Sequence, residues 1–176
     1  TEMEMIKGYR QFDIHGFWFV DDLGTQKALM ISPDMWRELF KERYKKQFDL
    51  VHSLGLHVLV HSCGYIFDII GDMIEIGVDV LNLDQPMLMG VDRLADAYGG
   101  KICFCCPVDI QQVLPRGDLE EIEREAEHMI EAFGKFNGGF IGKEYPQPAD
   151  IDLPPAGSEV MYQTFKRCNP YKQVGG

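Results

Sequence analysis

The stretch HVLVHSCGYIFDIIGDMIEIGVDVLNL, residues 57–83, indicates the fold class most clearly, because it predicts a strand, a helix and a second strand in direct succession. The apolar runs at 57–61 and 78–83 have strand length and are bounded by turn residues. Between them, apolar residues recur at helical spacing until Gly77 ends the pattern. Two strands that flank a helix in this way predict a parallel βαβ unit.

The same alternation continues on both sides of this stretch. Further apolar runs of strand length occur at 16–20, 102–106 and 138–142. Ser32 before Pro33 predicts a helix start, and the helical pattern that follows ends at Gly55. Five strands that alternate with helices predict an α/β fold with a parallel sheet, either open and doubly wound or part of a barrel. No glycine-rich fingerprint for binding phosphate follows any of the runs, so a dinucleotide or nucleoside triphosphate site is not indicated.

Polar side chains follow the predicted strands at their C-terminal ends. They are Asp21 and Asp22, Cys63, Asp84 and Gln85, Cys106 and Asp109, and Glu144 and Tyr145. Barrels of the (β/α) type keep their active sites at this end of the strands, which favours a TIM-barrel type of fold. A complete barrel needs roughly 250 residues, whereas this chain has 176. We therefore expect residues 1–176 to form a single, incomplete barrel of about five βα units, the C-terminal part of an eight-stranded barrel.

Composition limits the classes of function. Hydrophobic residues make up 45% of the chain and charged residues 26%, which is typical of a globular protein. The net charge of -11 argues against binding to nucleic acid, which needs clustered Lys and Arg. No apolar run approaches the roughly 18 residues of a membrane span, and the polar start of the chain is unlike a signal peptide, so we expect no membrane contact and a cytoplasmic location. The first residue is Thr rather than Met, so we also expect a processed or truncated piece.

The five cysteines are better explained as reduced thiols than as a disulfide framework. Their number is odd, and three of them crowd into CFCC at 103–106. Within this run, Cys103 and Cys105 share one face of the strand, and such residues often serve as small buried hydrophobic side chains. Cys106 comes last in the run and is expected nearest to the barrel mouth.

His61 and Cys63 are the most specific candidates for chemistry. Side chains alternate along a strand, so these two point to the same side, and Gly64 lets the backbone turn behind them. Imidazole nitrogen and thiolate sulfur are both zinc ligands, but a catalytic zinc needs three ligands from the protein. The pair predicts part of a metal site, unless the two residues only cap a buried strand. The third ligand is left open among Cys106, Glu144 and Tyr145.

Four stretches together resemble a known family in their order and spacing. They are DDLGTQKALMISPDMWRELFKERYKK at 21–46, HSCGYIFDIIGDMIEIGVDVLNLDQP at 61–86, YGGKICFCCPVDIQQVLPRGDLEEI at 98–122 and GGFI at 138–141. The chain resembles the C-terminal half of the uroporphyrinogen decarboxylase superfamily, and within it the branch of cobalamin-dependent methyltransferases. The resemblance implies a (β/α)8 barrel with its active site at the C-terminal mouth.

The methyltransferase branch uses zinc, held by a His-x-Cys pair and a later ligand, for methyl transfer to or from a corrinoid. The resemblance therefore implies zinc at His61 and Cys63, a small-molecule methyl donor or acceptor, and a partner protein that carries the corrinoid. This branch places a further cysteine after the last strand, where this chain has KEYPQP at 143–148. The residues that would line the pocket and orient the substrate are Asp21, Asp22 and Gln85.

Two other functions are compatible with the sequence. The decarboxylase branch removes carboxylate groups from a porphyrinogen in tetrapyrrole biosynthesis without a cofactor, and it uses N-terminal Arg and Asp groups that cannot be located in this chain. The third possibility is a non-catalytic half-barrel whose open sheet edge pairs with a partner chain. In that case Phe17, Phe19 and Val60, predicted as residues of the barrel interior, would drive the pairing.

Overall fold

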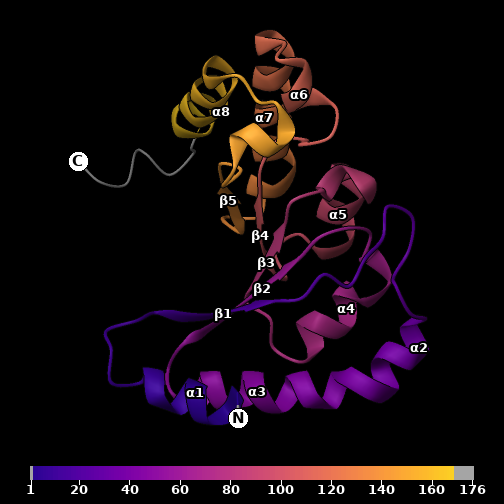
Figure 1. Ribbon diagram of the computed structural model, residues 1–176, viewed down its shortest axis with the longest axis vertical. Helices are drawn as coiled ribbons and strands as arrows, with labels where there is room; N and C mark the ends of the chain where they lie inside the picture. The colour runs from indigo at the N-terminus through magenta and orange to yellow at the C-terminus, as the bar shows by residue number, and fades with distance from the viewer. Residues whose placement is uncertain (1, 169–176) are drawn as a thin grey trace. The chain divides into compact units, whose positions relative to one another are not determined.

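The computed structural model describes residues 2–168 (Figure 1). Helices alternate with five strands, and the strands form one parallel sheet in the order β1-β2-β3-β4-β5, which confirms the predicted α/β class. The described residues fall into two compact units that divide between Asn82 and Leu83. No helix in the described range is both long enough and apolar enough to cross a membrane.

All five predicted strands form, and each begins and ends within two residues of its expected bounds. The first unit contains α1 (Glu2–Tyr9), β1 (Gly16–Val20), α2 (Pro33–Trp36), the π-helical turn η1 (Arg37–Lys41), α3 (Glu42–Ser53), β2 (His57–Ser62) and α4 (Phe67–Glu75). Strand β3 (Val80–Leu83) lies at the division. The second unit contains η2 (Pro86–Leu88), α5 (Val91–Tyr98), β4 (Cys103–Cys106), α6 (Val113–Arg116), α7 (Leu119–Gly134), β5 (Phe140–Gly142), η3 (Pro148–Ile151) and α8 (Pro155–Arg167).

Strands β1 and β2 of the first unit pair in parallel and present two different faces. In the register of the pair, Trp18 lies opposite Leu59 and Val20 opposite His61, so these four side chains share one face. Trp18 is 51% exposed and Val20 is 67% exposed, so this face of β1 is not covered by the helices of the unit.

The opposite face of the β1–β2 pair is covered by helices. The ring of Phe19 packs edge-on against Phe48 of α3, with 5.0 Å between the ring centres. Phe17 packs against Tyr9 of α1, with 5.7 Å between the ring centres. Val60 is 3% exposed on the same side as Phe19. The assignment of Phe17, Phe19 and Val60 to the barrel interior is therefore wrong. Strand alternation separates two apolar faces, but it does not say which of them the helices cover.

The long helical segment of the first unit starts where the sequence predicts. The Ser32 hydroxyl accepts a hydrogen bond from the Met35 N–H at 3.2 Å, which caps the first turn of α2. On η1, Arg37 and Lys41 form ion pairs with Asp72 of α4 at 3.0 and 2.8 Å. Burial alone would raise the pKa of Asp72, but hydrogen bonds from Arg37 and Lys41 hold it below its usual value. These ion pairs fix α4 against η1.

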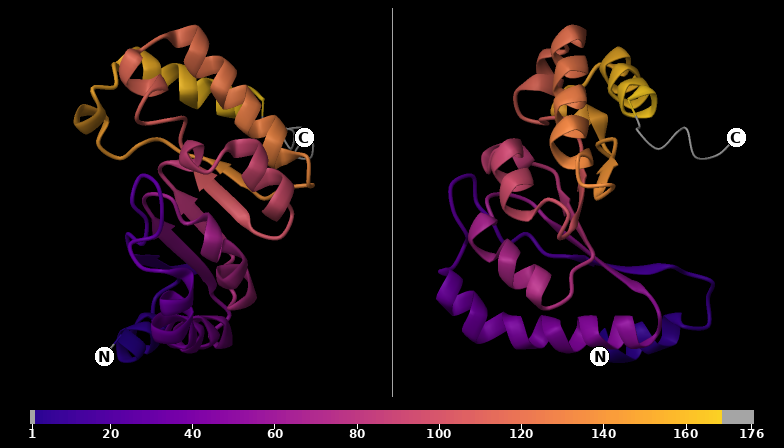
Figure 2. Two further views of the ribbon diagram at one scale, coloured as in Figure 1. Left: turned by 90° about the vertical axis from the view of Figure 1, so that its right-hand side faces the viewer. Right: turned by 180° about the vertical axis from the view of Figure 1, so that it is seen from behind.

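The second unit has its own aromatic core. Strands β4 and β5 pair in parallel, with Phe104 opposite Phe140. The ring of Phe133 on α7 packs against both, with its centre 4.7 Å from that of Phe104 and 5.4 Å from that of Phe140. The Asp118 carboxylate accepts hydrogen bonds from the N–H groups of Glu120 and Glu121, which caps the start of α7. Helices α7 and α8 lie side by side in every view (Figures 1 and 2).

Candidate metal centre

The metal-ligand candidates are brought together by two loops of the first unit, one after β1 and one after β2. Gly64 has a φ of +79°, which favours glycine, and a Cβ at this position would overlap the carbonyl of Gly24. The two loops can therefore touch only because residue 64 has no side chain. The contact places the Asp22 carboxylate at the end of β2, where its Oδ1 accepts a hydrogen bond from the Cys63 N–H at 3.0 Å.

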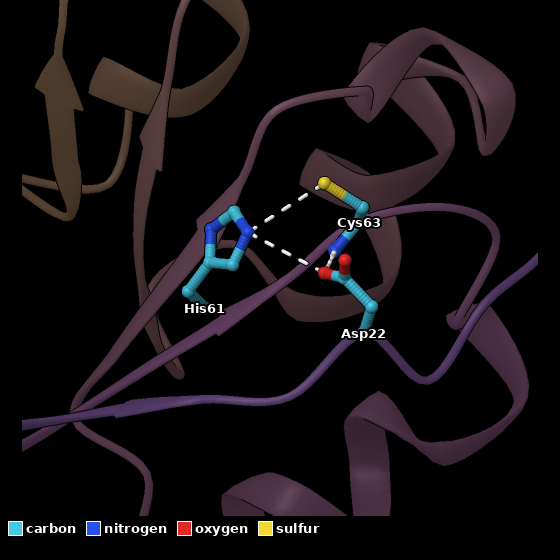
Figure 3. Close-up of side chains that lie close together, drawn as sticks. All are labelled: Asp22, His61 and Cys63. Carbon is cyan, nitrogen blue, oxygen red and sulfur yellow. Dashed lines mark hydrogen bonds and ion pairs between the residues drawn. The ribbon is translucent and has the colours of Figure 1, made fainter. Parts of the chain in front are cut away.

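His61, Cys63 and Asp22 form a cluster of potential metal ligands. Figure 3 shows the His61 Nε2 facing both other groups, with the Cys63 Sγ at 3.5 Å and the Asp22 Oδ1 at 3.6 Å. The three ligand atoms all lie within 4.8 Å of one another, and no other group of three such ligands does so among residues 2–168. His61 is 15% exposed and Asp22 57%, so the cluster is open on the side of the carboxylate.

The other ring nitrogen of His61 faces away from the cluster and has a separate partner. His61 Nδ1 lies 2.7 Å from the Oδ1 of Asn82 on β3. Asn82 is 1% exposed, so this contact is shielded from water. Sequence reasoning missed Asn82, although a polar residue inside the apolar run VDVLNL was a signal that this side chain needs a partner.

Asp21, predicted to line the pocket, points elsewhere. Its Oδ2 accepts a hydrogen bond of 2.6 Å from the Tyr44 hydroxyl on α3. Burial and this hydrogen bond both raise the pKa of Tyr44, so the phenol stays protonated and remains a donor. The structure therefore brings Asp22 into the cluster and holds Asp21 against the helix, although the two residues are adjacent in sequence.

The remaining predicted site residues lie in the second unit. Cys106 is fully buried, Gln85 and Tyr145 are half-buried, and Glu144 is exposed. The Lys143 N–H donates to the Cys106 carbonyl at 3.1 Å, which places Glu144 just beyond the end of β4. Among the described residues of this unit, no three His, Cys, Asp or Glu ligand atoms converge. An ion pair between Lys143 and Asp84, which are 16% and 10% exposed, was not foreseen from the sequence.

The thiols of β4 are shielded rather than activated. Burial, together with the nearby Cys105, raises the pKa of Cys103 to about 11. Burial also raises the pKa of Cys106 well above its usual range. These two thiols are therefore protonated at neutral pH, although Cys103 is half-buried and only Cys106 lies in the core.

Comparison with known proteins places this site in a family. The family model described as uroporphyrinogen decarboxylase (URO-D) matches residues 18–143, most of the chain. The chain belongs to the URO-D family. The matched range includes Asp22, His61 and Cys63, so the whole cluster lies within the family's homologous region. No curated protein is similar enough in sequence to match this URO-D family member.

Its fold is shared by solved structures, among them a methyltransferase and a xylanase. A methyltransferase from Methanosarcina mazei has a TM-score of 0.70 at 17% identity, over 94% of this chain and 47% of that one. A glycosylated endo-beta-1,4-xylanase of glycoside hydrolase family 10 from Gloeophyllum trabeum has a TM-score of 0.55 at 9% identity, over 93% of this chain and 64% of that one. This chain thus spans about half the length of the methyltransferase and less than two thirds of the xylanase.

Proposed function

We propose that this URO-D family chain carries the zinc site of a methyltransferase that acts with a corrinoid protein. The observation that carries the proposal is the convergence of Asp22, His61 and Cys63. Asp22 then supplies the third ligand, the place for which the sequence offered Cys106, Glu144 and Tyr145. Three ligands from the protein leave a fourth position for a substrate, the arrangement of catalytic zinc sites.

The distances within the cluster fit a tetrahedral zinc ion. Bonds of about 2.0 to 2.3 Å at tetrahedral angles separate neighbouring ligand atoms by roughly 3.3 to 3.8 Å. The His61 Nε2 lies 3.5 Å from the Cys63 sulfur and 3.6 Å from the Asp22 oxygen, so these two separations match those around a tetrahedral zinc ion. One nitrogen, one sulfur and one oxygen also suit zinc better than magnesium or calcium, which prefer oxygen ligands alone.

The chemistry of such a site supports methyl transfer. A zinc ion lowers the pKa of a thiol bound to it and so makes a nucleophile available at neutral pH. His61 at the end of β2 and Cys63 just after it would hold the ion, while the exposed Asp22 would flank the open position at which a methyl donor or acceptor binds. The methyltransferase activity named for the Methanosarcina mazei neighbour supports this class of reaction. None of the five cysteines forms a disulfide, which supports a reducing compartment such as the cytoplasm.

The test is the metal content of the purified chain, measured by elemental analysis after dialysis against zinc. We expect about one zinc per chain, lost in Cys63→Ser and retained in Cys168→Ser, a matched control whose thiol lies outside the cluster. Full zinc content in the Cys63→Ser variant would refute the site. Loss of zinc in both variants would show that zinc binds to the thiols of the chain nonspecifically, and would also refute the site.

The family itself supports a second candidate, the decarboxylation of a porphyrinogen. That reaction needs no metal, so the two candidates differ in one measurable property. A chain that binds no zinc but binds a porphyrinogen carboxylate would favour the decarboxylase. Stoichiometric zinc that depends on Cys63 would favour the methyltransferase.

We further propose that the complete protein contains more barrel strands than this chain. The share of the Methanosarcina mazei methyltransferase that it covers, 47%, supports this view. So do Trp18 and Val20, which stand exposed on the same face as His61. Sedimentation tests the consequence: the chain alone should self-associate, and a stable monomer at all concentrations would argue against a half-barrel that needs a partner.

A further inference from the structure

The contacts of His61 distinguish its two ring nitrogens. Nδ1 faces the Oδ1 of Asn82 at 2.7 Å, a distance typical of a hydrogen bond. Nε2 faces the Cys63 sulfur and the Asp22 carboxylate, at 3.5 and 3.6 Å. An amide oxygen can only accept a hydrogen bond, so Nδ1 must carry the proton. In the neutral ring, Nε2 is then left with a lone pair directed at the cluster.

We propose that Asn82 is a positioning residue that fixes the tautomer and ring orientation of His61. The consequence for metal binding rests on the proposed zinc site. An imidazole binds a metal through an unprotonated nitrogen, and the tautomer with hydrogen on Nε2 would block the position that faces Cys63 and Asp22. Metal-bound histidines commonly donate their second N–H to an oxygen of the protein, and Asn82 supplies that oxygen here.

The surroundings of Asn82 suit this role. Its side chain is 1% exposed, so water does not compete for the Nδ1–H group, and a hydrogen bond in such surroundings is stronger than one in solvent. Asn82 also lies on β3, a buried strand, and is not carried by a loop. The ring of His61 is thus held from two sides, by its own strand β2 and by the amide of the neighbouring residue on β3.

The experiment compares Asn82→Leu with Asn82→Asp. Leucine has the same branched shape as asparagine, with bulkier methyl groups and no acceptor, whereas aspartate keeps an oxygen in the same place. Two-bond proton–nitrogen NMR spectra of the metal-free chain report which nitrogen of His61 carries the proton. Competition with a chromophoric chelator reports zinc affinity.

We expect the wild type and Asn82→Asp to hold the proton on Nδ1, and Asn82→Leu to lose this preference. Zinc affinity should fall about 10- to 100-fold in Asn82→Leu, the usual cost of losing such a partner, and should be kept or increased in Asn82→Asp. Thr164→Val is the control for a buried polar residue replaced by an apolar one, since Thr164 is 1% exposed in the second unit. It should change neither quantity.

Several outcomes would overturn the proposal. A wild-type His61 with its proton on Nε2 does so without any variant, which keeps the test decisive even where Asn82→Leu fails to fold. Unchanged tautomer and zinc affinity in a folded Asn82→Leu variant would do the same. A wild type that binds no zinc, while its tautomer still depends on Asn82, would refute the proposed function but support the positioning role.

Discussion

The ends of β2 and β4 both carry cysteines, but the two strand ends place them in opposite surroundings. Cys63 follows β2, is half-buried, and lies beside an imidazole and a carboxylate. Cys105 and Cys106 end β4 and are buried, and the ring of Phe104 between Cys103 and Cys105 is 1% exposed. The same residue type thus faces potential metal ligands at one strand end and a hydrophobic core at the other.

The difference shows that a cysteine's neighbours, and not its position at a strand end, indicate its function. Each is the C-terminal end of a parallel strand, and (β/α) barrels keep their active sites at such ends. Only the end of β2 has a glycine turn that admits a second loop, and this loop carries Asp22 to the thiol. Two measurements test this contrast between the strand ends, and a third compares two carboxylates of the first unit.

The largest expected difference is in thiol reactivity. Because burial raises the pKa of Cys103 to about 11, we expect its alkylation by iodoacetamide at pH 8 to be about 100-fold slower in the native chain than in the urea-unfolded chain. The native rate should rise about tenfold per pH unit up to pH 11, since the thiolate is the reactive form. Tandem mass spectrometry locates the label within a peptide and so measures each cysteine separately, including the three that share the segment between Lys101 and Arg116. Added zinc should protect Cys63, and equal rates for native and unfolded Cys103 would contradict the shielding of this thiol.

A second difference concerns stability, tested by the same substitution at both strand ends. Cys106→Ser places a hydroxyl in a fully buried site and should lower the free energy of unfolding by about 1–3 kcal/mol. Cys63→Ser should change it by no more than about 0.5 kcal/mol in the metal-free chain, because the thiol is only half-buried. Urea denaturation followed by circular dichroism measures both. Equal destabilisation would mean that Cys63 is as structural as Cys106.

The smallest expected difference is between two carboxylates of the first unit. Asp72 should contribute to stability, whereas Asp22 of the cluster should not. Burial raises the pKa of Asp72, but hydrogen bonds and ion pairs with Arg37 and Lys41 lower it by more. The pKa of Asp72 is therefore lower in the folded chain than in the unfolded one. Asp72 therefore stabilises the fold above the unfolded pKa near 4, and this contribution disappears as the pH falls through the folded pKa. Asp72→Asn should lower the free energy of unfolding at pH 7 by up to about 1 kcal/mol. The variant should also lose less stability than the wild type when the pH is lowered.

The control for this measurement is Asp22→Asn. The Asp22 side chain is 57% exposed, so its replacement should leave stability within about 0.5 kcal/mol at either pH, although zinc binding should weaken. Acid unfolding curves of the two variants and the wild type provide the comparison. If Asp22→Asn lost more stability than Asp72→Asn, Asp22 would have a structural role.

Local patterns in the sequence were sufficient for the order of strands and helices. Apolar runs of strand length and glycines after helical segments depend on neighbouring residues, and all five strands form where these signals place them. The shared side of His61 and Cys63 was also predictable, because side chains alternate with a period of two along any strand. The reading of Cys103 and Cys105 as small hydrophobic residues followed from the cysteine-rich apolar run itself.

The tertiary structure alone decided which residues surround the pair. Asp22 and Asn82 are distant from His61 in sequence, and they meet it because β1, β2 and β3 lie next to one another in the sheet. The same holds for the two faces of β1, since alternation separates Phe19 from Val20 but only the packing of α3 shows that Phe19 lies on the covered side. The face of a strand that is buried depends on contacts with helices that are distant in sequence. Such contacts leave no periodic signal in the sequence.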